Sequence, residues 1–379
     1  MKNIATLKNN PLLSIAIPTW NRAPCLEKLL DSILSQIKEN KGEIEICVSD
    51  NNSTDNTAEV VMGFQKKYPG LINYNKNEKN IGADANILKI MEMSQGDFVW
   101  LFGDDDFIIN NGLKEVVGFV RESCRENTGL IIVSSQSYFL NKKTGEKEFY
   151  YNGFNKNKPK FFEINKKDII GLSFPAIGFI SALIFNGKLL RKILKEERKQ
   201  VEEWIGTSHI QMFFSALMFL KYPDISGLAF NKEIVCQELP QYKFDIEGKF
   251  ELHYRLQRKI NSLLLSNKYM NDNYAPLIVQ RGRKLAMEFI IDMAVMRAFK
   301  GYNYFSYFGC LKLFFQNASF IDALLFSAVF SILFLIPPII LTSMYKGLLM
   351  VKYGKKWKTK WELTSNVFYL VSMGTLRRV

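Results

Sequence analysis

The strongest chemical signal in the chain is a run of three carboxylates. Asp104, Asp105 and Asp106 follow Gly103 and an apolar stretch, residues 98–102, that is typical of a buried strand. Adjacent negative charges repel one another unless a cation or solvent neutralises them. Carboxylate oxygens bind hard divalent ions such as Mg²⁺ and Mn²⁺, which are often shared with substrate phosphates. The run therefore indicates either a metal and phosphate site or a solvated acidic turn before the next helix.

Three further segments combine short polar side chains with a bendable backbone. They are residues 14–22 (SIAIPTWNR), 48–57 (VSDNNSTDNT) and 77–86 (NEKNIGADAN). Such groups can hydrogen-bond a base, a ribose or a phosphate, although Asx turns and helix N-caps use the same residue types. Each segment alone fits both a ligand site and an ordinary turn.

The elements that must position these segments alternate between strands and helices. Short apolar runs predict strands, and apolar residues at helical spacing predict the helices between them. The predicted strands are residues 12–17, 44–49, 71–74, 98–102 and 130–134, and the predicted helices are 26–34, 60–64 and 87–93. This order predicts an α/β, Rossmann-like domain with a mostly parallel sheet and helices on both faces. Ligands of such sheets bind beyond the carboxyl ends of the strands, where the polar segments fall.

The middle of the chain predicts further elements around this sheet. Residues 141–167 are polar, lysine-rich and aromatic, which favours a loop or hairpin that extends over the site. Residues 171–185 are apolar and contain glycine, which favours a core strand or turn. Residues 200–222 have the pattern of a single helix.

Together, in this order and spacing, the polar segments resemble the family 2 glycosyltransferases of the GT-A fold over about residues 11–235. The pair GADAN and GDDD is most similar to bacterial enzymes that add sugars to O-antigen of lipopolysaccharide or to other lipid-linked surface glycans, including abequosyltransferase-like ones. The resemblance implies that Mg²⁺ or Mn²⁺ is bound by Asp105 and Asp106. It implies a nucleotide-sugar site that contains Pro18, Thr19, Asn21, Arg22, Asp50, Asn52, Asn80, Gly82, Asp84 and Asp104.

One position departs from the family pattern Asp-x-Asp-Asp. Alignment of the last two acids places Gly103 where the family has its first Asp. We therefore expect Asp105 to be the main metal ligand and Asp104 to face the ribose. Asp106 is expected to orient either the acceptor or the metal shell.

An inverting transfer also needs a base that deprotonates the acceptor hydroxyl as it attacks the anomeric carbon. In the family this base lies in an acidic motif about a hundred residues after the metal motif, and the corresponding stretch here is residues 201–209. We favour Glu203, with His209 and Glu202 as the alternatives. Exposed glutamates and a structural histidine on a helix explain the same residues without catalysis.

The last third of the chain differs in charge and hydropathy. From residue 251 onward there are 18 Lys/Arg and 6 Asp/Glu, out of 50 and 37 in the whole chain, so residues 1–250 are almost neutral. Residues 323–344 are nearly all apolar, are interrupted by Pro337-Pro338, and have aromatic residues before them and lysines after them. This pattern favours a re-entrant or interfacial helical hairpin on anionic headgroups with both ends in the cytoplasm, rather than a single span. A buried helix pair is the alternative, and no motif supports nucleic-acid binding.

The amino-acid composition excludes some classes of protein and of metal site, and it indicates the redox compartment. A hydrophobic content of 47% excludes wholesale disorder, two histidines exclude a multi-histidine metal centre, and five widely spaced cysteines fit a reducing compartment. No N-terminal signal peptide is evident, so we expect the cytoplasmic face of a bacterial inner membrane. Neither composition nor motifs indicate an oligomeric state.

The sequence thus predicts a membrane-associated inverting glycosyltransferase that moves a sugar from a nucleotide donor to a glycan on a polyprenyl diphosphate. UDP-sugars are favoured, with CDP-, GDP- and dTDP-sugars as alternatives. The expected regions are residues 1–235 (GT-A catalytic domain), 236–310 (basic amphipathic helices) and 311–379 (hydrophobic hairpin and lysine-rich membrane-associated end). A catalytically silent scaffold of a glycan assembly complex and a nucleotidyltransferase of similar fold are the rival interpretations.

Overall fold

The structure is a computed structural model in which the chain forms two compact units, residues 1–241 with 377–379 and residues 242–376. It describes residues 10–37, 42–140, 147–152, 158–164, 175–206, 209–222, 224–238, 290, 320–337, 339–341, 343–344, 346, 350 and 377–378. The predicted basic amphipathic helices and the lysine-rich end fall almost entirely outside the described residues.

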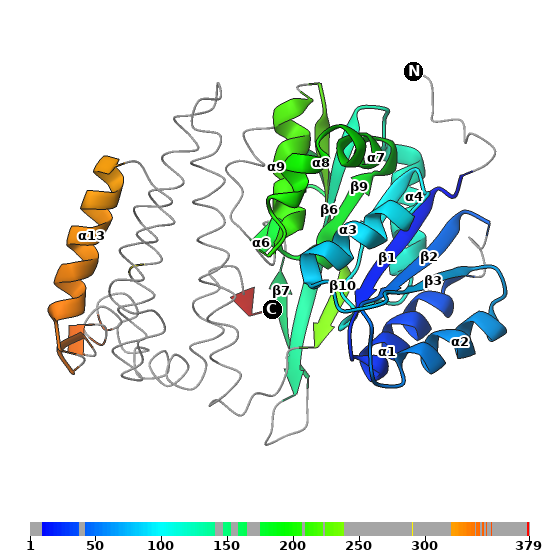
Figure 1. The fold of residues 1–379 in the computed structure, drawn as a ribbon, viewed down its shortest axis with the longest axis horizontal. Coiled ribbons are helices and arrows are strands. Elements are labelled where there is room, and N and C mark those ends of the chain that lie inside the picture. Colours follow the sequence, from blue (N-terminus) through cyan, green and yellow to red (C-terminus); the bar gives the residue numbers. More distant parts are fainter. Residues whose placement is uncertain are drawn as a thin grey trace. The chain divides into compact units, whose positions relative to one another are not determined.

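Four parallel strands form one half of the sheet, and the polar segments come directly after these strands in the chain. Their order is β4-β1-β2-β3, and three helices connect them (Figure 1). The strands are β1 (Leu13–Thr19), β2 (Ile44–Asp50), β3 (Ile72–Lys76) and β4 (Phe98–Leu101), and the helices are α1 (Ala23–Leu34), α2 (Thr57–Lys67) and α3 (Ala83–Met93). Parallel neighbours need such crossovers, so the carboxyl ends of these strands meet at one edge. The strands and helices predicted for this half are confirmed.

The rest of the sheet is largely antiparallel, so the prediction of a mostly parallel sheet is wrong. β9 runs antiparallel to both β4 and β6, β6 pairs with β7 as a hairpin, and β10 is parallel to β6 but antiparallel to β5 and β8. The strands are β5 (Asp106–Ile108), β6 (Thr128–Leu140), β7 (Lys147–Asn152), β8 (Phe161–Ile164), β9 (Leu183–Asn186), β10 (Ser226–Glu238) and β11 (Arg377–Arg378). The α/β class is confirmed, but the sheet is mixed because several strands return through connections other than helical crossovers.

The predicted single helix over residues 200–222 is two helices. α8 (Arg198–Glu202) ends, the chain turns, and α9 (Ile210–Lys221) begins. Gly206 has a φ of +95°, a backbone conformation that glycine adopts without strain and that an α-helix excludes. The remaining helices are α4 (Gly112–Ser123), α6 (Pro175–Gly178), the 3₁₀ helix η2 (Ile180–Ala182) and α7 (Gly187–Glu196).

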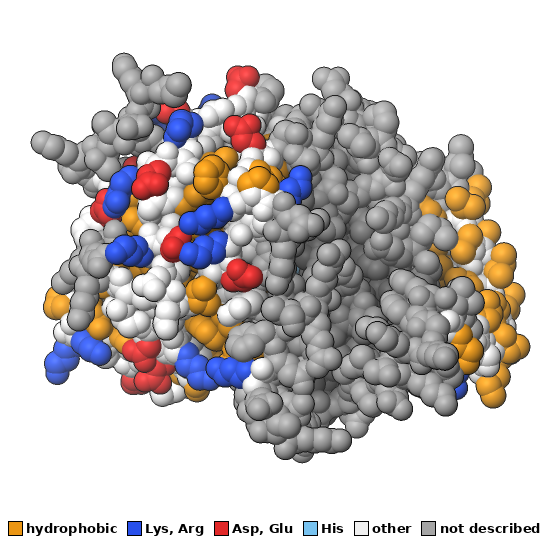
Figure 2. All heavy atoms as spheres, turned by 180° about the vertical axis from the view of Figure 1, so that it is seen from behind, with side chains coloured by type: hydrophobic (Ala, Val, Ile, Leu, Met, Phe, Trp, Pro, Cys, Tyr) orange, Lys and Arg blue, Asp and Glu red, His pale blue; other side chains and the backbone are white. Residues whose placement is uncertain are grey.

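The described part of the second unit is mainly the apolar helix α13 (Phe320–Leu335). The helix ends before Pro337, as the paired prolines predict, and residues 339–341 are helical again. Large hydrophobic side chains are exposed on this segment (Figure 2), among them Ile332 at 62% and Leu335 at 80%. Over the residues that the structure describes, no helix combines the length and the apolar character that a membrane span needs.

Candidate functional site

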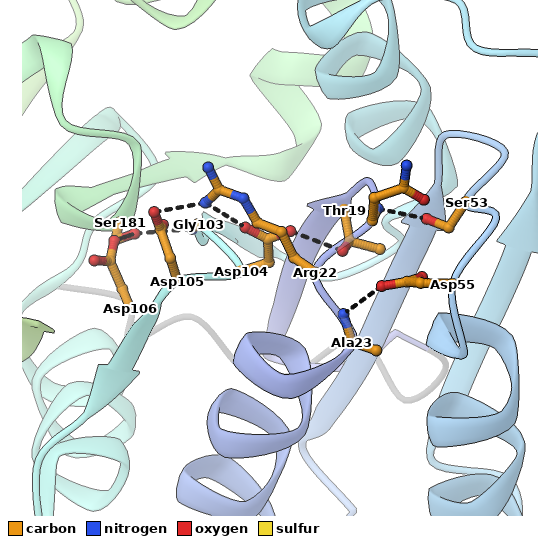
Figure 3. Close-up of polar contacts among 11 residues, drawn as sticks. Thr19, Arg22, Ala23, Ser53, Asp55, Gly103, Asp104, Asp105, Asp106 and Ser181 are labelled. Atoms are coloured by element: carbon orange, nitrogen blue, oxygen red, sulfur yellow. Dashed lines mark hydrogen bonds and ion pairs between the residues drawn. The ribbon is translucent and has the colours of Figure 1, made fainter. Parts of the chain in front are cut away.

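The carboxyl ends of β1 and β4 bring together one cation and two of the three consecutive carboxylates. Thr19, the last residue of β1, donates its hydroxyl hydrogen bond to Asp104 at 2.7 Å. The Arg22 guanidinium lies 3.3 Å from an oxygen of Asp104 and 2.6 Å from an oxygen of Asp105 (Figure 3). Thr19, Arg22, Asp104 and Asp105 therefore form a single polar cluster at the predicted edge of the sheet.

Burial separates the three carboxylates. The Asp105 side chain is 47% exposed, whereas Asp104 and Asp106 are buried. Burial raises the pKa of Asp104 to about 6, although the charge of Arg22 acts in the opposite direction. Burial, followed by the charge of Asp105, raises the pKa of Asp106 well above its ordinary value. Asp105 is thus the carboxylate of the motif that is open to a ligand from solvent.

Ser181, on η2, holds the far end of the acidic motif. Its hydroxyl donates to Asp106 and accepts a hydrogen bond from the Gly103 N–H at 2.8 Å, while its carbonyl accepts from the Trp100 indole at 2.8 Å. A Cβ at position 103 would lie 3.1 Å from an Asp106 oxygen and 3.3 Å from the Ser181 hydroxyl. The glycine that departs from the family pattern therefore occupies a crowded position. By resemblance, residues 179–181 correspond to the acceptor-side strand of the family, but the sequence assigned Ser181 no individual role.

Most polar side chains after β2 shape the loop itself. Asp50 is buried and accepts hydrogen bonds from the Ser53 N–H at 2.7 Å and from the Tyr74 hydroxyl at 2.8 Å. Asn21 (φ +52°) accepts from the Thr54 N–H at 2.7 Å, which ties this loop to the end of β1. The Asx-turn interpretation therefore accounts for these contacts. Two other predicted donor-site residues share the edge: Pro18 pairs with Ser49 in the β1–β2 register, and Asn52 adopts a φ of +63°.

Asparagines fix the loop that leads into α3. The side-chain oxygen Oδ1 of Asn80 accepts from the Asn51 side-chain amide and from the Gly82 N–H, both at 2.9 Å. Asn51 in turn accepts from the Ile81 N–H at 2.9 Å. Gly82 has a φ of +86° and open space where a Cβ would be, so glycine is needed for the conformation and not for lack of room. Asn51 was missed by sequence reasoning, although it lies inside the asparagine-rich motif.

The three candidate bases lie where α8 ends and α9 begins: Glu202 is the last residue of α8, Glu203 follows it, and His209 precedes α9. Glu202 pairs with Arg198 at 2.6 Å, and Arg198 also contacts Glu92 near the end of α3. This end is opposite the edge that carries the donor loop, because the 11 residues of α3 span about 16 Å. Glu203 is exposed, and His209 is fully buried as the N-cap residue of α9. Glu202 is thus engaged in an ion-pair group with Arg198 and Glu92.

Trp20 is a further residue that sequence reasoning missed. It is 50% exposed and lies between Thr19 and Asn21, directly after the end of β1. An exposed aromatic ring at a polar edge provides a flat surface on which a base can stack. The signal in the sequence was an aromatic residue inside an otherwise polar motif.

The oxygen donors of the acidic motif fit a hard divalent ion. Asp105 presents an exposed carboxylate, and an Asp106 oxygen is buried with no hydrogen-bond partner among the described residues. Carboxylates are the ligands that Mg²⁺ and Mn²⁺ prefer. In the part of the chain that the structure describes, no three His, Cys, Asp or Glu side chains are arranged to hold a metal.

We expect the free energy of unfolding to fall as pH rises from about 4 to about 6. The Asp104 pKa is about 6 in the folded chain against an ordinary 3.8, so the unfolded chain ionises first. A shift of this size corresponds to about 2 to 3 kcal/mol. Urea unfolding at several pH values would measure the trend, and Asp104→Asn should reduce its slope, leaving the part that is due to Asp106. An unchanged pH slope in Asp104→Asn would contradict the assignment.

Part of the chain matches a known protein family and several curated proteins. Residues 14–183 match the family described as glycosyl transferase family 2. Abequosyltransferase RfbV of Salmonella typhimurium is 32% identical over 218 residues, which cover 55% of this chain and 61% of that protein. The GalNAc(5)-diNAcBac-PP-undecaprenol beta-1,3-glucosyltransferase of Campylobacter jejuni is 29% identical over 197 residues, 52% of this chain and 57% of that protein. The chain thus spans about three fifths of the length of these curated relatives.

Among solved structures, the mannosyltransferase PcManGT of Pyrobaculum calidifontis, in complex with GDP-Man and Mn²⁺, aligns with a TM-score of 0.49 and 13% identity. The alignment covers 96% of this chain and 89% of that chain. A likeness at this level carries no conclusion about ligands.

Proposed function

Residues 14–183 match glycosyl transferase family 2, the family that their motifs resemble, and on this premise we propose that the chain transfers a sugar from a nucleotide donor to a glycan acceptor. The donor binds at the carboxyl ends of β1, β2 and β4. Transfer proceeds with inversion: the acceptor oxygen bonds to the anomeric carbon, the bond to the nucleoside diphosphate breaks, and a base takes the acceptor proton.

The polar cluster of Thr19, Arg22, Asp104 and Asp105 is the observation that supports the donor site. Asp104, buried and held by Thr19, is an oriented acceptor for a ribose hydroxyl. Arg22 is 47% exposed at its side chain and brings a positive charge to the position where a diphosphate would lie. Asp105 and Asp106 would hold Mg²⁺ or Mn²⁺, and such an ion supplies charge stabilisation to the departing diphosphate when bound.

Binding of nucleoside diphosphates tests the proposal. Purified protein would be titrated with UDP, GDP, CDP and dTDP, each with and without Mn²⁺, while its melting temperature is followed. A ligand at a hundred times its Kd stabilises the folded state by about 2.7 kcal/mol. We expect one nucleotide, with UDP favoured, to give a Mn²⁺-dependent shift. No shift with any nucleotide would contradict the proposal, and binding without sugar transfer would support the rival interpretation of a silent scaffold.

We propose a lipid-linked acceptor and a site of action at the cytoplasmic face of a bacterial inner membrane. The name of one curated relative describes transfer to a glycan joined through PP to undecaprenol. The residues from 251 onward are basic, which suits a diphosphate carrier in an anionic membrane. The exposed apolar side chains of α13 and the segment after it suit an interfacial position.

The membrane proposal predicts binding to lipid vesicles. Wild-type protein should float with vesicles that contain anionic phosphatidylglycerol. The double variant Leu325→Asp and Ile332→Asp should bind at least about tenfold more weakly, because each exposed apolar side chain contributes about 1.5 kcal/mol or more when buried in lipid. Met62→Asp, at an exposed methionine of α2, is the matched control and should bind like wild type. Equal flotation of all three proteins would contradict the proposal.

A further inference from the structure

Asp84 connects two parts of the first unit that are far apart in the sequence. It lies in the first turn of α3 and is 3% exposed. One of its oxygens accepts the Gly206 N–H at 2.8 Å, and the other accepts the Ile210 N–H at 3.2 Å. Gly206 lies in the connection between α8 and α9, and Ile210 is the first residue of α9, directly after the candidate base His209.

The start of α9 needs a partner of this kind. The first N–H groups of a helix have no acceptor within the helix, and they attract a negative charge because of the helix dipole. His209 occupies the N-cap position of α9 without a side-chain capping bond. The Asp84 carboxylate therefore caps α9 from another helix, a role that local sequence cannot reveal.

The residues before and after Asp84 contact the carboxyl-terminal edge of the parallel strands. We call this edge, where the donor is proposed to bind, the donor edge. Two residues earlier, Gly82 is the N-cap residue of α3 and lies in the loop that Asn80 and Asn51 hold. Two residues later, Asn86 accepts from the Ser49 hydroxyl at 2.7 Å and donates to the Ser49 carbonyl at 2.9 Å. The first turn of α3 is thus fixed to the carboxyl end of β2. Through its hydrogen bonds, Asp84 in this turn also fixes the start of α9.

A stacking contact also holds the connection between α8 and α9 against α9. The rings of Trp204 and Phe213 lie 3.4 Å apart between centroids at an interplanar angle of 14°. Trp204 follows Glu203 directly, and Phe213 is in the first turn of α9. Displacement of the start of α9 would therefore also displace the segment that carries Glu203.

We infer that Asp84 is a positioning residue for the transfer reaction, an inference that rests on the proposed function. Through the N–H groups of Gly206 and Ile210, it sets Glu203 and His209 relative to the donor edge. The family resemblance implied instead that Asp84 contacts the nucleotide sugar. The two roles differ in what they predict for nucleotide affinity and turnover.

The test compares Asp84→Ala, Asp84→Asn and the exposed control Asp31→Ala with wild type. Kd would be measured with UDP and Mn²⁺, and turnover as release of the nucleoside diphosphate from UDP-, GDP-, CDP- or dTDP-glucose, whichever wild type uses fastest. Hydrogen exchange would report the amides of residues 206–210. We expect Asp84→Ala to lower kcat by about 10- to 100-fold, to change Kd less than about threefold, and to raise exchange at these amides. Asp84→Asn, which keeps an acceptor oxygen, should recover part of kcat.

Two results would overturn the inference. One is a tenfold or larger loss of UDP affinity with unchanged exchange, which would make Asp84 a donor contact. The other is faster exchange with unchanged kcat, which would make the contact merely structural. If Asp84→Ala does not fold, Asp84→Asn alone decides by the same criteria. Wild-type protein that neither binds nor turns over any nucleotide would instead overturn the proposed function, while its exchange would still report the contact.

Discussion

Asp105→Asn is expected to lower the rate of sugar transfer by about 10²- to 10³-fold, the loss that follows removal of one preorganised electrostatic group. Asparagine keeps the shape of the side chain but loses the charge that pairs with Arg22 at 2.6 Å and that would bind a divalent ion. The variant should also lose the Mn²⁺ dependence of nucleotide binding. Initial rates over a range of Mn²⁺ concentrations would measure both effects.

Asp31→Asn, at an exposed position of α1, is the control for the loss of one carboxylate. It should match wild type in rate and in metal dependence. A rate for Asp105→Asn within about threefold of wild type would show that Asp105 does not act on the departing diphosphate. If the rate is low but still depends on Mn²⁺, Asp105 contacts the nucleotide-sugar donor and does not bind the ion.

Glu203→Gln is expected to lower kcat by about 10²- to 10⁴-fold, because it removes the group that would accept the proton of the attacking hydroxyl. The side chain is exposed on the connection that Asp84 fixes, so an acceptor can reach it. Nucleotide affinity should change little, since the donor edge is formed by other residues. Separate measurements of kcat and of Kd for the nucleotide would distinguish a base from a binding residue.

Glu202→Gln is the matched control, because it changes the neighbouring glutamate in the same way. Its carboxylate is engaged by Arg198, which also contacts Glu92 at the far end of α3, so its loss should leave kcat within about twofold. His209→Asn tests the remaining candidate. A large loss in His209→Asn with near-normal turnover in Glu203→Gln would transfer the role of base to the buried histidine.

The parallel half of the domain was predictable because its signals are local. The alternation of apolar strands and helices between residues 12 and 102 was confirmed in the structure, and the rule that ligands bind beyond strand ends located the acidic motif and the Thr19–Arg22 segment. The antiparallel half was less predictable. β10 is long, contains Lys232 and Glu233 within it, and shifts register at this point, so no clean alternation marks it.

The residue types and their order along the chain are enough to show which chemistry is available: three carboxylates after a strand, an arginine, and asparagine-rich turns at neighbouring strand ends. Which of these groups meet depends on the tertiary fold. Ser181 reaches Asp106 across 75 positions of sequence, and Asp84 reaches Ile210 across 126. Periodicity and turn preference reflect interactions between residues close in the chain, whereas these contacts depend on strand order and helix packing, which local patterns do not encode.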